Sequence, residues 1–185
     1  MKLGLTFLRT IVGLLFVGHG TQKLFGWFGG HGPEGTGQFF ENLGLKPGIK
    51  HARAAGASEA GGGALLAVGF LTPAAAAAII GVMTTAIRKV HFKNGPWVTN
   101  GGYEYPLSLI AAMVLFADLG PGDVSLDHAL GTEIKGPLVA LLALGAGIGG
   151  ATMMTRPAEP QMAQAPPSPT AEPAEVGEEA LVGIA

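Results

Sequence analysis

The sequence predicts an all-α membrane protein, a four-helix transmembrane bundle followed by a fifth, C-terminal transmembrane helix. The chain of 185 residues is 48% hydrophobic and only 13% charged, whereas a soluble domain is about 25% charged. It contains several apolar runs close to the roughly 20 residues that a helix needs to cross the hydrocarbon core. It has no cysteine, so redox chemistry would need a bound cofactor or a partner protein.

Four apolar runs form the predicted bundle, at residues 3–25, 52–70, 74–90 and 105–119. The last run is short, so we expect Tyr103 and Glu104 in its first turn. The second and third runs should form an antiparallel hairpin, because they nearly adjoin and Pro73 suits the first turn of a helix. Residues 137–154 are uncharged and rich in glycine. We expect them to form the fifth helix, since lipid-exposed backbone must be helical.

These runs divide the chain into a bundle at 1–135, a fifth transmembrane helix at 136–154 and a tail at 155–185. The tail is mostly Pro, Ala, Glu and Gln and should be disordered, because it has little apolar surface to bury. The first run resembles a signal peptide, but it is too long and no small-residue cleavage site follows it. We expect it to be retained.

Two polar connections carry further signals. Residues 26–51 are dense in glycine, and Phe39, Phe40 and Leu43 give them an amphipathic segment expected on the membrane surface. In the loop 120–136, Ser125 or Asp127 could cap a short helix.

The cations indicate an orientation. We call the side of the membrane that holds the N-terminus side A and the opposite side, side B. Outside the spans, only two cations fall on side A. Side B carries Lys23, Lys46, Lys50, Arg53, Arg88, Lys89 and Lys93. By the positive-inside rule side B is cytoplasmic and the N-terminus is outside.

A first candidate site consists of ionisable residues inside the predicted bundle, namely Arg9, His19, Lys23 and Glu59. Arg9 and Lys23 share one helical face with small residues. Glu59 is flanked by Ala55, Gly56, Gly62 and Gly63, which allow close helix approach. A carboxylate inside the membrane needs a cationic or hydrogen-bonding group beside it, and we expect Arg9 or His19 to supply this group. The pair could be a packing contact or a ligand or proton site.

A second candidate site lies on side B, where "HFKNGPWVTNGGYEYPLSL" collects aromatic and charged residues. Glu104 should meet several cations there, in the first turn of a helix that favours an anion. The site comprises Arg53, Arg88, His91, Tyr103 and Glu104. It could be an aromatic belt around a salt bridge, or a headgroup site for a quinone or a lipid.

Other classes of site find little support. The histidines have no metal-ligand spacing, and His19 with His91 would be a poor pair of axial haem ligands. No phosphate-binding glycine motif and no nucleophile with a base is evident. Nothing indicates nucleic acid as a partner.

Four segments resemble, in order and spacing, the DoxX family of small bacterial membrane proteins. They are "LRTIVGLLFVGHGTQKLFGWFGG", "GASEAGGGALLAVGFLTPAAA", "MTTAIRKVHFKNG" and "GGYEYPLSLIAAMVLFADLGPGDVSLD". The likeness covers about residues 3–130, and the matching positions are Arg9, Gly18, Gly20, Lys23, Glu59, Gly62, His91, Gly101, Gly102, Glu104, Pro121, Gly122, Ser125 and Asp127.

The resemblance implies a four-helix bundle in the bacterial inner membrane. The family is similar to the small subunit of thiosulfate:quinone oxidoreductase (DoxD), and other members are linked to oxidoreductase assemblies in stress defence. It therefore implies a non-catalytic or quinone-interacting subunit of a membrane redox assembly, with the bilayer and an oxidoreductase subunit as partners. An accessory role fits better than a self-sufficient enzyme. The alternatives are a small-solute carrier and a membrane scaffold unrelated to redox chemistry.

Overall fold

The computed structural model describes residues 3–156, which contain helices and no strand. The expected disordered tail, 155–185, lies outside the described residues from 157 onward. Short 3-10 turns are η1 (Trp27–Gly29), η3 (Phe92–Asn94) and η4 (Val98–Asn100), and η2 (Ile87–His91) is a π-helical turn. The α-helices are α1 (Leu3–Phe25), α2 (Gly32–Asn42), α3 (Gly48–Val68), α4 (Thr72–Ala86), α5 (Glu104–Leu119), α6 (Leu126–Leu130) and α7 (Pro137–Met154).

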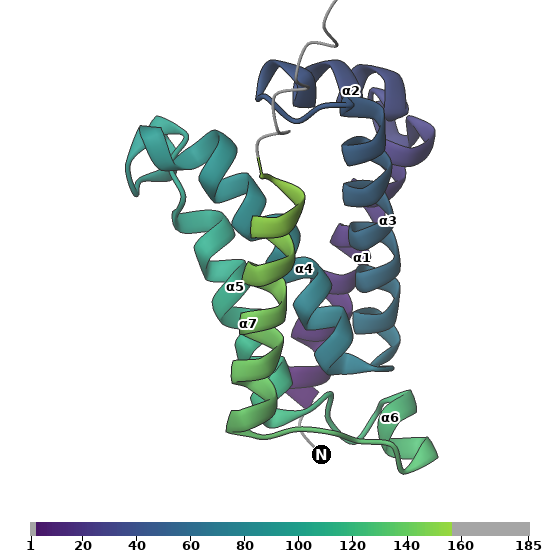
Figure 1. Ribbon diagram of the computed structural model, residues 1–185. Helices are drawn as coiled ribbons and strands as arrows, with labels where there is room; N and C mark the ends of the chain where they lie inside the picture. Colours follow the sequence, from purple (N-terminus) through teal and green to yellow (C-terminus); the bar gives the residue numbers. More distant parts are fainter. Residues whose placement is uncertain (1–2, 157–185) are drawn as a thin grey trace, which may run out of the picture.

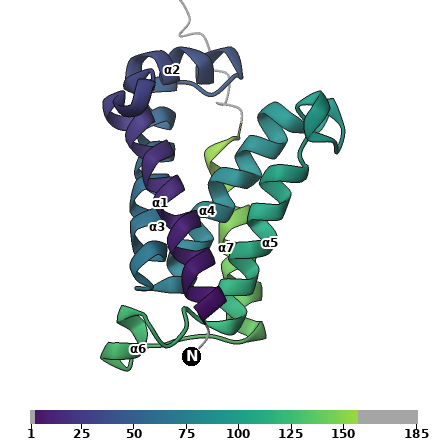
Figure 2. The same ribbon diagram turned by 180° about the vertical axis from the view of Figure 1, so that it is seen from behind.

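The helices form two groups that meet through the hairpin of α3 and α4. Helices α1, α2 and α3 pack together, and so do α4, α5 and α7. Figures 1 and 2 show that the groups diverge from the end where α6 and the N-terminus lie toward the end where α2 crosses the first group. We call the first end the closed end and the second the open end. They correspond to sides A and B of the sequence analysis.

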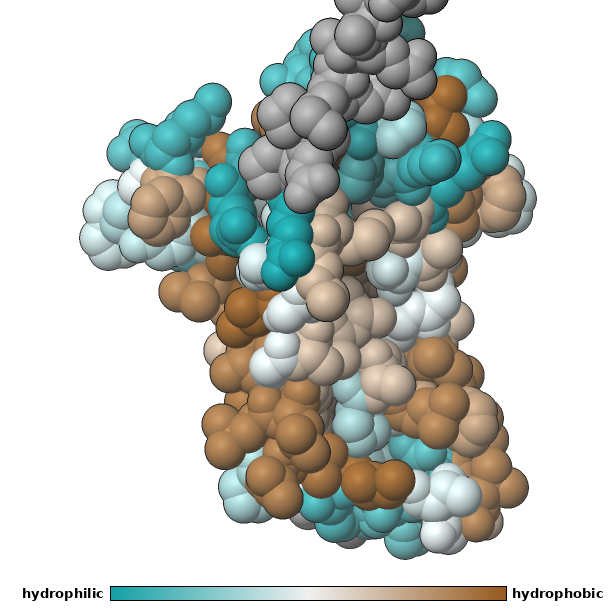
Figure 3. Space-filling view, viewed as in Figure 1, coloured by the Kyte–Doolittle hydropathy of each residue, from teal (hydrophilic) through white to brown (hydrophobic). Residues whose placement is uncertain are grey.

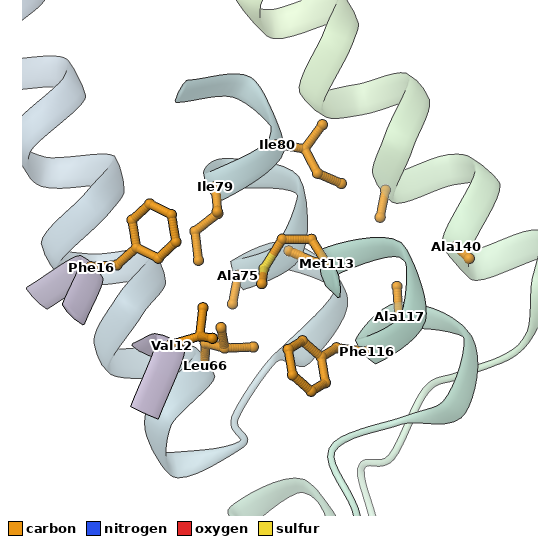
Figure 4. Packing of buried hydrophobic residues seen from close by; sticks show 12 residues of the cluster. Val12, Phe16, Leu66, Ala75, Ile79, Ile80, Met113, Phe116, Ala117 and Ala140 are labelled. Atoms are coloured by element: carbon orange, nitrogen blue, oxygen red, sulfur yellow. The ribbon is translucent and has the colours of Figure 1, made fainter. Parts of the chain in front are cut away.

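The two groups are joined by a small apolar core in the half of the bundle nearer the closed end (Figure 4). Phe16 of α1, Ile79 of α4 and Met113 and Phe116 of α5 are buried in it. In lipid there is little hydrophobic driving force for such contacts, so close packing must stabilise them. Small residues help, since Ala75, Ala117 and Ala140 belong to the same cluster.

Helices α1 and α3 touch along a seam of glycines. A Cβ atom added to Gly13 would lie 2.6 Å from the carbonyl oxygen of Gly63, and one added to Gly63 would lie 2.6 Å from that of Gly13. A Cβ added to Gly20 would likewise lie 2.6 Å from the oxygen of Gly56. The expected close approach through Gly56 and Gly63 is confirmed. Gly62 faces the other neighbour, α4.

The outer surface suits a bilayer. Three helices are long and apolar enough to cross a membrane, namely Leu3–Phe25, the continuous helix Thr72–Asn94, and Pro137–Met154. In Figure 3 the brown and tan surface lies between hydrophilic patches at the two ends. Helices α3 and α5 lie beside these three, but α5 has only 16 residues and α3 carries Arg53 and Glu59. That these two also span remains a prediction.

Candidate functional site

At the closed end Arg9 holds α1 against α3 and the loop before α6. Its side chain is buried, and Nη1 donates hydrogen bonds of 2.7 Å to the carbonyl oxygens of Leu66 and Ala67. Nη2 donates to the carbonyl oxygen of Val124, also at 2.7 Å. The carbonyl oxygens at a helix C-terminus lack intrahelical partners and carry partial negative charge. Arg9 therefore neutralises the end of α3.

The expected pairing of Arg9 with Glu59 is wrong. Arg9 lies seven residues into α1, near the closed end, where the C-terminal carbonyls of α3 are within reach. Glu59 stands about two turns nearer the open end.

Asp127 of α6 is a second buried charged residue at the closed end. It is 1% exposed, and its carboxylate accepts hydrogen bonds from the backbone N–H groups of Leu71 and Thr72 at 3.0 and 3.1 Å and from the Thr72 hydroxyl at 2.9 Å. Asp127 thus caps α4 and not a short surface helix. Ser125 performs the expected local role, because its hydroxyl accepts the N–H of His128 at the start of α6.

The partner of Glu59 is Lys23. The Lys23 Nζ lies 2.6 Å from Glu59 Oε2. Glu59 is 3% exposed, while the Lys23 side chain is 23% exposed. Lys23 lies near the end of α1, and its long side chain reaches inward to the carboxylate. His19 lines the same cavity as the pair, and its Nδ1 is 3.1 Å from Gln22 Oε1.

This ion pair faces a large cavity between the two helix groups. The cavity has a volume of about 870 Å³ and extends from Phe16 in the core to Met154 and Thr155 at the open end. Its walls come from α1 to α5 and from α7, and most of the side chains in them are apolar. Phe40 and Leu43 contribute to it, so α2, the expected amphipathic helix, directs part of its apolar face inward. The acidic and basic residues in the walls are His19, Lys23, His51, Glu59, Lys89 and His91.

The second predicted site does not form an ionic cluster. Glu104 Oε1 accepts the N–H of Val98 at 2.5 Å, and within residues 3–156 no cation forms a salt bridge with it. Arg88 donates to the Thr152 hydroxyl of α7 at 3.0 Å, and Arg53 is exposed. The expectation fails because the backbone of the loop itself satisfies Glu104.

The loop before α5 is instead braced internally. His91 Nδ1 lies 2.7 Å from the carbonyl oxygen of Gly101, and the Asn94 amide donates to the same oxygen at 3.1 Å. Tyr103 stacks on Phe92 with ring centroids 5.9 Å apart. Trp97 is exposed, as an aromatic residue at a membrane interface would be. Of this predicted site, only His91 lines the cavity.

Sequence reasoning missed three features. His51 and Lys89 line the cavity, but neither was assigned to a site. The hydrogen bonds that join Asp127 to the start of α4 were not predicted. No sequence signal indicated the last, because Thr72 directly before Pro73 suggests a local N-cap, whereas in the structure the N-cap is Leu71, which has no side-chain acceptor.

No group of three or more His, Asp or Glu suited to a metal ion occurs in the described part of the chain. Residues 4–92 match the family model for DoxX. The match supports membership of the DoxX family. The matched segment runs from α1 through η2 and so includes Arg9, Lys23, Glu59, Lys89 and His91. No curated protein and no solved structure matches this DoxX chain. Together with its apolar helices, the family identifies it as a membrane protein.

Proposed function

We propose that this DoxX protein is a quinone-interacting subunit of a redox assembly in the bacterial inner membrane. The observation that carries the proposal is the Lys23–Glu59 pair, a charged contact of 2.6 Å set in the wall of a mostly apolar cavity of about 870 Å³. A small-molecule site typically combines an apolar cavity of about 300–1,000 Å³ with a few polar groups that orient the ligand.

The two parts of the cavity suit the two parts of a quinone. Apolar residues such as Val12, Ala78 and Leu109 line it and would contact an isoprenoid chain. At the pair, the Lys23 ammonium can donate a hydrogen bond to a quinone carbonyl. The Glu59 carboxylate can accept one from a quinol hydroxyl, and such a carboxylate can also receive the proton. The pair therefore offers a group for each redox state of the headgroup.

Electrons would come from a partner subunit. The chain has no cysteine and no nucleotide-binding motif, and no nucleophile with an oriented base occurs among residues 3–156. These features favour an accessory subunit that positions the quinone beside an oxidoreductase partner. A solute carrier, in contrast, would need a route through the end that Arg9 and Asp127 close.

The test is the quinone content of the purified protein. Full-length protein is extracted in mild detergent, and bound quinone is quantified by chromatography of an organic extract. We expect wild type to retain quinone and Glu59→Gln to lose about tenfold, since a charge-assisted hydrogen bond is replaced by a weaker one. Glu104→Gln is the matched control, because Glu104 does not line the cavity, and it should retain quinone as wild type does.

Two results would count against the proposal. Wild type that neither retains quinone nor binds it when it is added back has no quinone site. Equal retention by Glu59→Gln and Glu104→Gln removes the ion pair from any site. In either case the second candidate, a membrane scaffold held together by a structural Lys23–Glu59 contact, becomes the better account.

A further inference from the structure

The walls of the cavity carry more positive than negative charge. Glu59 is the only carboxylate among the lining residues, and Lys23 already neutralises it. Lys89 also lines the cavity and forms no salt bridge within residues 3–156. His51 and His91 lie in the same walls and can add charge when protonated. The open end of the cavity is therefore an environment that favours an anion.

Lys89 and His91 come from one short element. Both belong to η2, the π-helical turn that continues α4, and π-helical turns are frequent at functional sites. His91 Nδ1 contacts the carbonyl oxygen of Gly101 at 2.7 Å, so this nitrogen must carry the hydrogen. The other ring nitrogen, Nε2, can donate to a ligand carboxylate when the ring is in its imidazolium form. A cation and an oriented imidazole thus occur together near the open end of a mostly apolar cavity.

We propose that this rim binds the carboxylate of a long-chain fatty acid, with Lys89 as the main anchor and His91 beside it. The hydrocarbon chain would extend inward along the apolar surface that α4, α5 and α7 provide, where Val82, Leu109 and Met154 lie. A carboxylate there would give Lys89 the acidic partner that residues 3–156 do not supply. The cavity has a volume of about 870 Å³, which suits one chain.

This inference uses the same cavity as the proposed quinone site but does not depend on it. The ion pair that would contact the quinone lies on α1 and α3, whereas Lys89 and His91 lie on the opposite helix group. A fatty acid and a quinone would compete for the apolar space between them. The two sites differ in the residues on which they depend, so their failures can be separated.

Binding is measured with the full chain in nanodiscs of phosphatidylcholine, a lipid without net charge. The probes are cis-parinaric acid, a fluorescent fatty acid, and its methyl ester, which has the same chain without the charge. We expect wild type to bind the acid at least tenfold more tightly than the ester. Lys89→Gln should lose about tenfold in affinity for the acid, with little change for the ester, and Lys89→Arg should restore most of it.

Lys93→Gln is the matched control. Lys93 is exposed, lies four residues further along and does not line the cavity, so its loss should leave binding of both probes unchanged. Thermal unfolding of each variant shows whether it is folded. Equal losses in Lys89→Gln and Lys93→Gln would mean that the cations attract the acid only through the general surface potential. Equal affinity of wild type for acid and ester would likewise overturn the inference.

A third arm identifies the source of the anion. Nanodiscs with a few per cent of phosphatidylglycerol should leave binding of the acid unchanged. If this lipid displaces the acid from wild type, the rim is a phospholipid site and the fatty-acid assignment fails. Glu59→Gln separates the two proposals, because it should lose quinone while it still binds the acid.

Discussion

The closed and open ends of the bundle both bury charged side chains, but they pair them differently. At the closed end Arg9 and Asp127 contact mainly backbone groups, namely the last carbonyls of α3 and the first N–H groups of α4. At the open end Lys23 and Glu59 contact each other beside a cavity. Backbone partners cannot move without unfolding a helix, whereas a side-chain pair can open toward a ligand. The difference fits a stabilising role for the closed end and the proposed binding at the open end.

Replacement of Arg9 by leucine should have the largest effect on stability. It would remove the Arg9 hydrogen bond from each of three buried or half-buried carbonyl oxygens, at about 1 kcal/mol each, so we expect a loss of about 3 kcal/mol. Thermal unfolding in detergent and the yield of folded protein measure it. Arg9→Lys should recover part of the loss, since an ammonium cannot reach all three oxygens. A wild-type melting temperature in Arg9→Leu would contradict the assignment.

Asp127→Ala should destabilise the closed end by about 2 kcal/mol, because two backbone donors of α4 and the Thr72 hydroxyl lose their acceptor. Asp127→Asn keeps one carbonyl oxygen and should cost about half as much. The same unfolding assay applies, and hydrogen exchange at Leu71 and Thr72 should increase in Asp127→Ala. Unchanged exchange there would show that the cap is unimportant.

Gly63→Ala tests the seam that holds α1 to α3 between the two ends. The new Cβ would clash with the backbone of Gly13, so we expect a loss of about 1.5 kcal/mol. Gly61→Ala is the control, since a Cβ at that position meets nothing within 4 Å and alanine favours a helix. It should be neutral or slightly stabilising. Equal effects of the two substitutions would argue against a tight seam.

The smallest effect on stability is expected at the open end. Glu59→Gln preserves the shape of the side chain and an oxygen that can accept from Lys23, and Lys23 is partly exposed. The loss should be about 0.5 kcal/mol in the unfolding assay. Glu59→Leu should cost more, because it leaves Lys23 without a partner in the cavity wall. A loss in Glu59→Gln as large as that in Arg9→Leu would remove the distinction between the two ends.

The helices were largely predictable because apolar runs and proline determine them. The predicted runs at 3–25 and 137–154 coincide with α1 and α7, and the third and fourth runs differ from α4 and α5 by a few residues. The second run begins at residue 52, whereas α3 already begins at Gly48. Polar residues such as Lys50 and Arg53 extend the helix beyond the apolar part that the sequence pattern detects.

The partners of the charged residues were much less predictable. Helical spacing shows which side chains face inward, so Arg9, Lys23 and Glu59 were recognised. It does not show backbone groups as partners, and Arg9 and Asp127 both bind backbone. The Lys23–Glu59 contact was accessible in principle, because a lysine near a helix end can reach about one turn inward. The cavity could not be predicted, since it depends on the angle between two helix groups.

The glycine seam also determines how the molecule can change shape. Backbone meets backbone at Gly13 and Gly63 and again at Gly20 and Gly56, so α1 and α3 lie too close together for one helix to slide easily past the other. They must move as one rigid body. Any widening of the cavity is therefore a rotation of this pair against α4, α5 and α7, and the pivot is the short α3–α4 connection at the closed end, which Asp127 fastens.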